Sequence, residues 1–287
     1  MAFHSVAQLL SASETQPLWY AVLRDDCLDR DVTEVESLEK MSCLWRAMVR
    51  SAEEYDPARR SASGLSGGQA ARMEQAADTL CGPFLQQVMA TALRVGEQNA
   101  CMGRIVAAPT AGASGVLPAV LLPLQRQRGL EDEIMVRCLY VAAGFGQVIA
   151  DRASISGAEG GCQAEIGSAS AMAAAALVYA AGGDGTQMAA ACAMALQNVM
   201  GLVCDPVAGL VEAPCVKRNV MGAVNALSCA DMALCGIRGA IPCDEVIDAM
   251  GAVGRMLPTA LRETGEGGLA ATPTGRRIAE EQGAAER

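Results

Sequence analysis

Three of the twelve cysteines lie where the chain leaves regular structure. Cys162 follows a Gly-Gly pair and precedes a long apolar stretch. Cys204 and Cys215 lie among prolines and glycines in 201–219 (GLVCDPVAGLVEAPCVKRN). Thiols on loops can converge on a metal more easily than thiols along one helix face, and a helix N-terminus favours the thiolate. The three residues are therefore candidate metal ligands, and the alternative is three buried cysteines near kinks.

The number of thiols bears on the kind of metal site. Three thiolates are one short of the four that usually hold an iron–sulfur cluster, so one iron would keep an open position and could act as a Lewis acid. Zinc on three cysteines would need a fourth protein ligand. The only histidine is His4, which excludes a histidine triad or a multi-histidine metal site within this chain. No CxxC pair occurs either, so a zinc ribbon or thioredoxin-like site lacks its usual spacing.

A second candidate site is the loop 107–115 (AAPTAGASG), which precedes the apolar run VLPAVLLPL. Thr110, Gly112 and Ser114 would present hydroxyls and backbone N–H groups without bulky side chains. Such a loop at the start of a helix can hold a carboxylate or a phosphate. A plain capped turn is the alternative interpretation.

Composition indicates which elements must position these residues. Hydrophobic residues make up 52% of the 287 residues, charged residues 19% and aromatic residues only 3%, so the core must consist largely of Ala, Leu, Val and Met. Alanine is the best helix former, and small residues let helices approach closely. We expect an all-α fold, a compact bundle of Ala-rich buried helices with cluster-binding loops. One domain over 1–287 is expected, with a mobile connector near 61–68 and a loose tail over 276–287.

Charge and hydropathy exclude several classes of protein. The formal net charge of −10 disfavours binding to nucleic acid or to an anionic membrane surface. The apolar segments 166–183 and 187–203 are alanine-dominated and shorter than the ~20 residues of a membrane span, so we expect buried helices there. The first residues (MAFHSVAQLLSASETQP) show no signal-peptide pattern. We therefore expect a cytoplasmic protein with reduced cysteines.

Several segments resemble the α chain of iron–sulfur-dependent L-serine dehydratase in its split, two-chain form. They are PTAGASG at 109–115, SGAEGGCQAEIGSA at 156–169, GLVCDPVAGLVEAPCVKRN at 201–219, GAVNAL at 222–227, IPCDEVIDAM at 241–250 and LRETGEGGLAATPTG at 261–275. The resemblance covers nearly the whole chain and is most specific over 101–275. It implies a mainly helical fold, a [4Fe-4S] cluster and the deamination of L-serine to pyruvate and ammonia without pyridoxal phosphate.

The resemblance also implies roles for particular residues. Cys162, Cys204 and Cys215 would be the cluster ligands, and the open iron would bind the β-hydroxyl of serine. The loop residues Thr110, Gly112 and Ser114 would hold the substrate carboxylate. Lys217, with its neighbour Arg218, would add positive charge near the substrate or the cluster, although a solvated basic pair is the alternative.

Two departures from the family pattern matter. Single-chain members carry an N-terminal domain with a Ser-Ser-Ser-His-Thr segment, whose histidine is a candidate base, and this chain lacks that segment. We expect a separate β chain to supply the missing domain and the catalytic base, which this sequence does not identify. Some single-chain members end in a cysteine that caps the open iron, whereas the last cysteine here is Cys243.

Other readings remain open at this point. The same cluster chemistry on L-cysteine or L-threonine would change only the substrate, and one methyl group is worth only ~1–3 kcal/mol of discrimination. A non-catalytic iron–sulfur partner subunit is the other alternative. Cys229, Cys235 and Cys243 are spaced like a possible metal cluster, but they lie in an alanine-rich helical stretch and are expected in the core.

Overall fold

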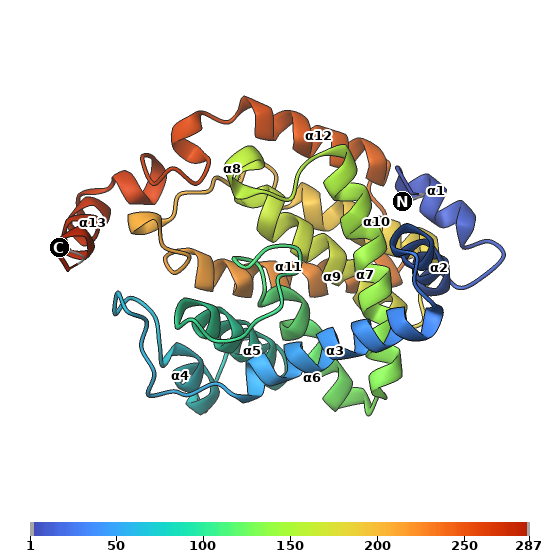
Figure 1. Cartoon of the computed structure of the whole chain (residues 1–287), viewed down its shortest axis with the longest axis horizontal. Coiled ribbons are helices and arrows are strands. Elements are labelled where there is room, and N and C mark those ends of the chain that lie inside the picture. Colours follow the sequence, from blue (N-terminus) through green and yellow to red (C-terminus); the bar gives the residue numbers. More distant parts are fainter. Residues whose placement is uncertain (1–2, 286–287) are drawn as a thin grey trace.

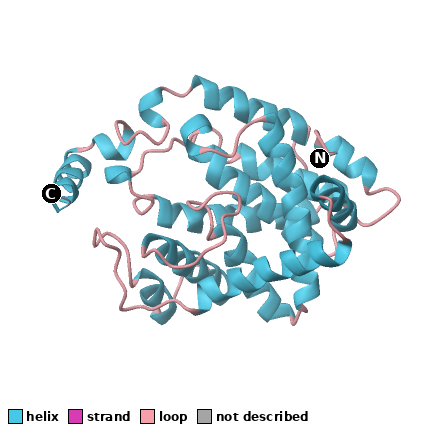
Figure 2. Cartoon of the chain, in the orientation of Figure 1, coloured by secondary structure: helices cyan, strands magenta, loops and turns pink. Residues whose placement is uncertain are grey.

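The computed structural model describes residues 3–285, and within them the chain forms helices and loops with no strand beyond one isolated bridge between Cys204 and Arg262 (Figure 2). This confirms the all-α prediction. The α-helices are α1 (Val6–Ala12), α2 (Leu18–Arg30), α3 (Glu34–Glu53), α4 (Gln69–Gln75), α5 (Gly82–Ala100), α6 (Val116–Arg128), α7 (Asp132–Arg152), α8 (Gly157–Gly160), α9 (Ser168–Ala180), α10 (Gly185–Gln197), α11 (Cys215–Leu234), α12 (Cys243–Met256) and α13 (Pro273–Ala285). The short elements are the π turn η1 (Gln163–Gly167) and the 3-10 turns η2 (Val207–Gly209), η3 (Thr259–Leu261) and η4 (Gly268–Ala271).

Helix α9 lies at the centre of the bundle and packs against α6, α7, α10 and α11 (Figure 1). Six of its seven alanines are fully buried: Ala169, Ala171, Ala173, Ala174, Ala175 and Ala176. Methyl side chains allow the neighbouring helices to approach it on every side. The low aromatic content of the chain is therefore matched by a core in which close backbone approach replaces large side chains.

The two alanine-rich segments form α9 and α10, as expected for buried helices. By length and composition, α7 is the one described helix apolar enough to cross a membrane, and 67% of its apolar window is buried inside the bundle. The burial of α7 by α2, α3 and α9 is typical of the core helix of a globular bundle.

Local signals in the sequence explain several helix boundaries. Thr33 begins α3 with a capping box, because its side chain accepts from the Glu36 N–H while the Glu36 carboxylate accepts from the Thr33 N–H. Asp184 and Gln187 form the same arrangement at the start of α10. Gly129 ends α6 in the left-handed conformation, at φ 62°.

Both ends of the described chain contact other parts of the molecule. His4 is exposed and lies just before α1, with its ring Nδ1 2.9 Å from Asp151 Oδ2. Within the range 276–287, where a loose tail is predicted, the chain forms α13 up to Ala285, and Gln282 Nε2 donates to the Ser63 carbonyl at 3.1 Å. Residues 286 and 287 lie outside the described residues. The single domain stays a prediction.

Candidate active site

Cys162 is positioned by a tight turn at the end of α8. Gly161 has φ 75°, and a Cβ there would lie 2.9 Å from the Leu202 carbonyl oxygen, so only glycine fits. The Gln163 N–H donates to the same carbonyl at 3.0 Å. Cys162 then lies directly before the π turn η1, which leads directly into α9. Single π turns inside helices often occur at functional sites, and the sequence analysis did not predict this one.

Cys204 and Cys215 flank an irregular loop that contains η2. The C-terminal segment runs alongside Cys204: the Cys204 N–H donates to the Leu261 carbonyl at 2.9 Å, and the Glu263 N–H donates to the Cys204 carbonyl at 2.8 Å. Cys215 is the first residue of α11, directly after Pro214. The loop therefore places one thiol beside the C-terminal segment and the other at a helix N-terminus.

The three thiols are buried, and Cys162 interacts with each of the other two. Cys162 and Cys204 are 2% exposed and Cys215 is 7% exposed. The neighbouring Cys204 thiol lowers the pKa of Cys162, with help from the Arg218 guanidinium, and the pKa of Cys204 is raised by the same interaction. Burial and the charge of Cys162 raise the pKa of Cys215 to about 12. Three segments far apart in the sequence thus bring their thiols into one buried site.

A buried ion pair supports this site. Arg218 Nη2 lies 2.8 Å from Asp205 Oδ1, with the side chains 14% and 4% exposed. Arg218 Nη1 also donates to the Val203 carbonyl at 2.9 Å, and Asp205 Oδ2 accepts from the Leu269 N–H at 2.8 Å. One pair of side chains therefore joins α11, the Cys204 loop and the C-terminal segment, and places a cation next to Cys162.

The loop 109–115 lies against the start of α11 through Asn219. The Asn219 amide accepts from the Gly115 N–H at 2.9 Å and donates to the carbonyls of Gly112 at 2.7 Å and Cys215 at 3.0 Å. A Cβ on Gly115 would meet Asn219 Oδ1 at 2.9 Å, so glycine permits this close contact. One buried amide thereby fixes the loop relative to Cys215.

Two hydroxyls of this loop lack partners. Thr110 Oγ1 and Ser114 Oγ are buried and make no hydrogen bond among the described residues, as is also true of Ser168 Oγ at the start of α9. The Thr110 hydroxyl faces the Glu165 carboxyl and lowers its pKa without making a well-directed bond. Buried hydroxyls rarely stay unpaired, so these groups are available to a bound ligand or water.

Glu165 is a residue of η1 whose carboxyl lies between the thiols and the 109–115 loop. Its Oε2 accepts from Cys204 Sγ at 3.8 Å, and a Cβ on Gly112 would lie 3.6 Å from its Oε1. Burial raises the pKa of Glu165, and the nearby Glu263 carboxylate raises it further. The site therefore holds a half-buried carboxyl that contacts both the Cys204 thiol and the 109–115 loop.

Lys217 is the predicted site residue that the structure does not bring to the others. It is exposed on α11, whereas its neighbour Arg218 is directed toward the thiols. The role of Lys217 near the substrate stays a prediction. Sequence reasoning missed Asp205, Glu165 and Asn219 as site residues, although all three lie within a few residues of a candidate cysteine in the segments that carry the resemblance.

The expectation that Cys229, Cys235 and Cys243 lie in the core is right for two of the three. Cys229 and Cys243 are buried as expected, but Cys235 is exposed, because it ends α11. All twelve cysteines are free thiols. The buried ones outside the site are Cys101, Cys138, Cys192, Cys229 and Cys243; Cys43, Cys81 and Cys235 are exposed, and Cys27 is half-buried.

Residues 61–68, where a mobile connector is predicted, form a loop that contacts the segment between Cys204 and Cys215. Ser61 and Ser63 donate to the Glu212 carboxylate at 2.6 and 2.8 Å, and Glu212 lies in the loop between Cys204 and Cys215. The buried Glu97 carboxylate accepts from the backbone N–H groups at the start of α4. The connector therefore has defined contacts at both of its ends.

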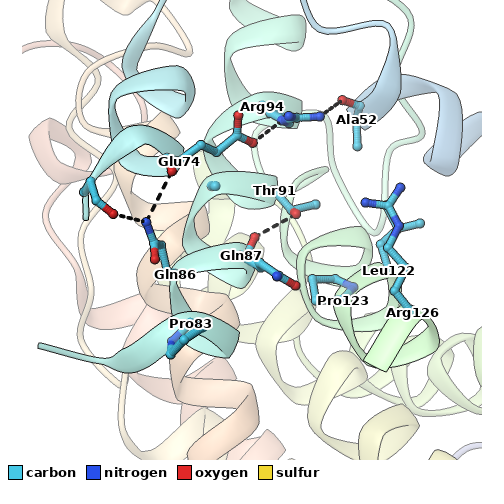
Figure 3. Close-up of a pocket in the computed structure, with 12 residues that line it drawn as sticks. Ala52, Glu74, Pro83, Gln86, Gln87, Thr91, Arg94, Leu122, Pro123 and Arg126 are labelled. Atoms are coloured by element: carbon cyan, nitrogen blue, oxygen red, sulfur yellow. Dashed lines mark hydrogen bonds and ion pairs between the residues drawn. The ribbon is translucent and has the colours of Figure 1, made fainter. Parts of the chain in front are cut away.

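A cavity of about 300 Å³ between α4, α5 and α6 lies apart from this chemistry (Figure 3). Its charged groups are already engaged: Arg94 pairs with Glu74 at 2.5 Å, and Arg126 pairs with Glu53 at 2.9 Å. None of the candidate cysteines lines it. Its polar side chains serve contacts between the helices.

The donor set indicates which metal group the site could take. Among the described residues, no three His, Cys, Asp or Glu side chains are arranged around a single ion. A cubane cluster takes one thiolate on each iron, so its ligands surround a larger body than one ion. Three buried thiols from separate segments, with a cation nearby and no imidazole, fit an iron–sulfur cluster better than zinc.

Comparison with known proteins identifies the family of the chain. Residues 5–270 match the family model described as serine dehydratase alpha chain. The chain is 56% identical over 221 residues to the probable L-serine dehydratase, alpha chain, of Bacillus subtilis (strain 168), covering 76% of this chain and 74% of that protein. It is 50% identical over 200 residues to the L-serine dehydratase, alpha chain, of Peptoniphilus asaccharolyticus, covering 70% and 68%.

One of the relatives is much longer than this chain. The chain is 44% identical over 181 residues to L-serine dehydratase 2 of Escherichia coli (strain K12), covering 62% of this chain but only 40% of that protein. The α-chain relatives, in contrast, are matched over most of their length. The chain belongs to the serine dehydratase alpha chain family.

Proposed function

We propose that this chain is the α subunit of an L-serine dehydratase that converts L-serine to pyruvate and ammonia. The observation that carries the proposal is the convergence of Cys162, Cys204 and Cys215 on one buried site beside a loop with unpaired hydroxyls. The family membership gives the substrate, because the relatives are named for L-serine.

The cofactor in this proposal is a [4Fe-4S] cluster held by the three thiols, without pyridoxal phosphate. When bound, it supplies an open iron that acts as a Lewis acid toward the substrate β-hydroxyl. Arg218 balances the negative charge that the thiolates bring into the buried site, and Asp205 holds Arg218 in place. Asn219 keeps the Cys215 end of the site in register with the substrate loop.

The loop 109–115 would bind the substrate carboxylate. Thr110 Oγ1 and Ser114 Oγ are buried without partners, and α6 begins directly after Gly115, at Val116. A carboxylate there would accept from the hydroxyls and lie at the positive end of the helix dipole. This arrangement would orient the Cα–H and Cβ–O bonds relative to the thiol site.

The reaction needs a base that removes the Cα proton while the β-hydroxyl leaves, giving aminoacrylate, which becomes an imine and is hydrolysed. The only histidine of this chain, His4, is exposed and pairs with Asp151. We propose that a separate β chain supplies the base, consistent with the relatives being named alpha chains. The cytoplasm is the proposed location, where thiols stay reduced.

The test is to produce the chain together with its β chain without oxygen, reconstitute it with iron and sulfide, and record EPR spectra with and without L-serine. We expect a cluster signal that changes with serine, and release of pyruvate. Turnover of L-serine, L-threonine and L-cysteine side by side should favour serine. A site that binds no cluster, with the β chain present, would contradict the proposal, and a cluster that ignores all three amino acids would indicate a non-catalytic subunit.

A further inference from the structure

Glu165 has an unusual environment for a carboxylate. It lies three residues after Cys162, and its carboxyl contacts Cys204 Sγ and faces Thr110 and Gly112. Among the described residues it belongs to no ion pair. Arg218, the cation whose charge acts on it, is already paired with Asp205 at 2.8 Å. A desolvated carboxylate is costly unless a cation or several donors compensate it.

Glycines keep space around this carboxyl. A Cβ on Gly157 would lie 2.6 Å from Glu165 Oε2, which is closer than real Cβ atoms approach, so the backbone of α8 reaches the carboxyl only because position 157 has no side chain. On the other side, Gly112 presents the loop backbone to Oε1. The Glu165 carboxyl therefore lies close to the backbone at Gly157 and Gly112 and to the Cys204 thiol.

The order of groups across the site matches the order of groups in an α-amino acid. Glu165 contacts the Cys204 thiol and also interacts with the Thr110 hydroxyl of the 109–115 loop, so it has one neighbour in each part of the proposed site. Under the proposed function, the β-hydroxyl of serine is directed to the thiol side and its carboxylate to the loop. The α-ammonium group, which lies between these two groups on the same molecule, then falls next to Glu165.

We propose that the Glu165 carboxylate binds the α-ammonium group of the substrate and so restricts this site to α-amino acids. This inference rests on the proposed function and adds a specificity-determining residue to it. The substrate cation supplies the partner that the protein itself does not provide. A β-hydroxy acid without the ammonium group would leave the carboxylate unpaired, and the site would reject it.

The test compares two ligands that differ in the ammonium group. L-serine and glycerate share the carboxylate and the β-hydroxyl, but glycerate has a hydroxyl at Cα. We would measure the KM of serine and the Ki of glycerate as a competitive inhibitor for the reconstituted enzyme with its β chain. In Glu165→Gln, we expect the serine KM to rise about 10- to 100-fold, as for loss of a charged hydrogen bond, with the glycerate Ki within about 3-fold of its original value.

The matched control is Glu159→Gln in α8, since Glu159 is exposed and its carboxylate accepts from the Ser154 hydroxyl at 2.7 Å. It should leave both constants unchanged. Iron content and the EPR signal are recorded for each variant. If Glu165→Gln does not retain iron, the serine KM and the glycerate Ki are measured for Glu165→Asp instead. This variant keeps the negative charge but shortens the side chain, so the serine KM should again rise more than the glycerate Ki.

Three results would overturn the inference. One is an equal loss of affinity for serine and glycerate, which indicates a structural role. Another is no change in either constant. The third is that both Glu165 variants fail to hold iron, which would assign the carboxylate to the metal site. Failure of the proposed function is seen separately, because the unsubstituted enzyme would then neither turn over serine nor show a serine-dependent spectrum.

Discussion

Cysteines in two regions of this molecule are equally buried and chemically different. Cys138, within α7, is fully buried, and Cys162, between α8 and α9, is 2% exposed. Burial alone raises the pKa of Cys138 to about 12, whereas the Cys204 thiol and Arg218 lower the pKa of Cys162. The difference comes from neighbours: a regular helix surrounds its thiol with apolar atoms, and an irregular loop brings other thiols and a guanidinium to it. Burial by itself therefore does not distinguish a core cysteine from a candidate ligand.

The most direct test of this difference removes one thiol from each region. Cys204→Ser should abolish iron binding and pyruvate formation, because only two thiolates remain. Cys138→Ala should keep both and cost about 1 kcal/mol of stability, as for a typical core substitution. Iron content and serine turnover measure the first effect, and urea unfolding the second. Iron retained in Cys204→Ser, or lost in Cys138→Ala, would show that the two regions are not distinct in this way.

The next largest effect is expected at the ion pair of the site. Arg218→Gln leaves Asp205 buried without a cation, which typically costs about 3–5 kcal/mol. The control is Arg126→Gln in the exposed pair with Glu53, where the cost should be about 0–1 kcal/mol. Urea unfolding of both variants checks the difference. Equal costs would mean that the site pair adds no more than a surface pair.

A glycine comparison isolates the backbone strain beside Cys162. Gly161→Ala places a Cβ 2.9 Å from the Leu202 carbonyl and 2.7 Å from Leu257 Cδ1, at φ 75°. Gly182→Ala meets nothing within 4 Å at φ 83°, so only the left-handed conformation opposes it, by about 1–2 kcal/mol. We expect a larger loss of stability for Gly161→Ala, together with loss of iron. Thermal unfolding and iron content measure these losses, and equal stability in the two variants would argue against a tight Cys162 turn.

The smallest effect is expected in the alanine-rich helix. Ala175→Leu adds volume to a fully buried position of α9 and should cost about 1–3 kcal/mol by overpacking. The same change at the exposed Ala279 of α13 should be close to neutral. The folded Ala175→Leu variant should still turn over serine, because none of the three candidate cysteines lies in α9. A neutral Ala175→Leu would indicate that the bundle is less closely packed around α9 than the structure shows.

Much of the fold followed from composition and pattern. The scarcity of aromatic residues and the long alanine runs predicted an all-α core, since alanine favours helices and lets them approach closely. The three cysteines beside glycine and proline marked the candidate ligands, because such residues interrupt helices and free the thiols from a helix face. The loop with Thr110 and Ser114 was identified in the same way, from small polar residues before an apolar run.

Tertiary structure alone decided how these pieces meet. The sequence did not show that Arg218 rather than Lys217 is directed toward the thiols, because adjacent positions on a helix point in different directions and only the packing of α11 determines which one is buried. Nor did it show Glu165 between Cys204 and the 109–115 loop, or Asn219 joining that loop to Cys215. Residue types and local spacing set which groups are available for chemistry, whereas long-range packing sets which of them share a site, since contacts between residues a hundred positions apart leave no periodic signal in the chain.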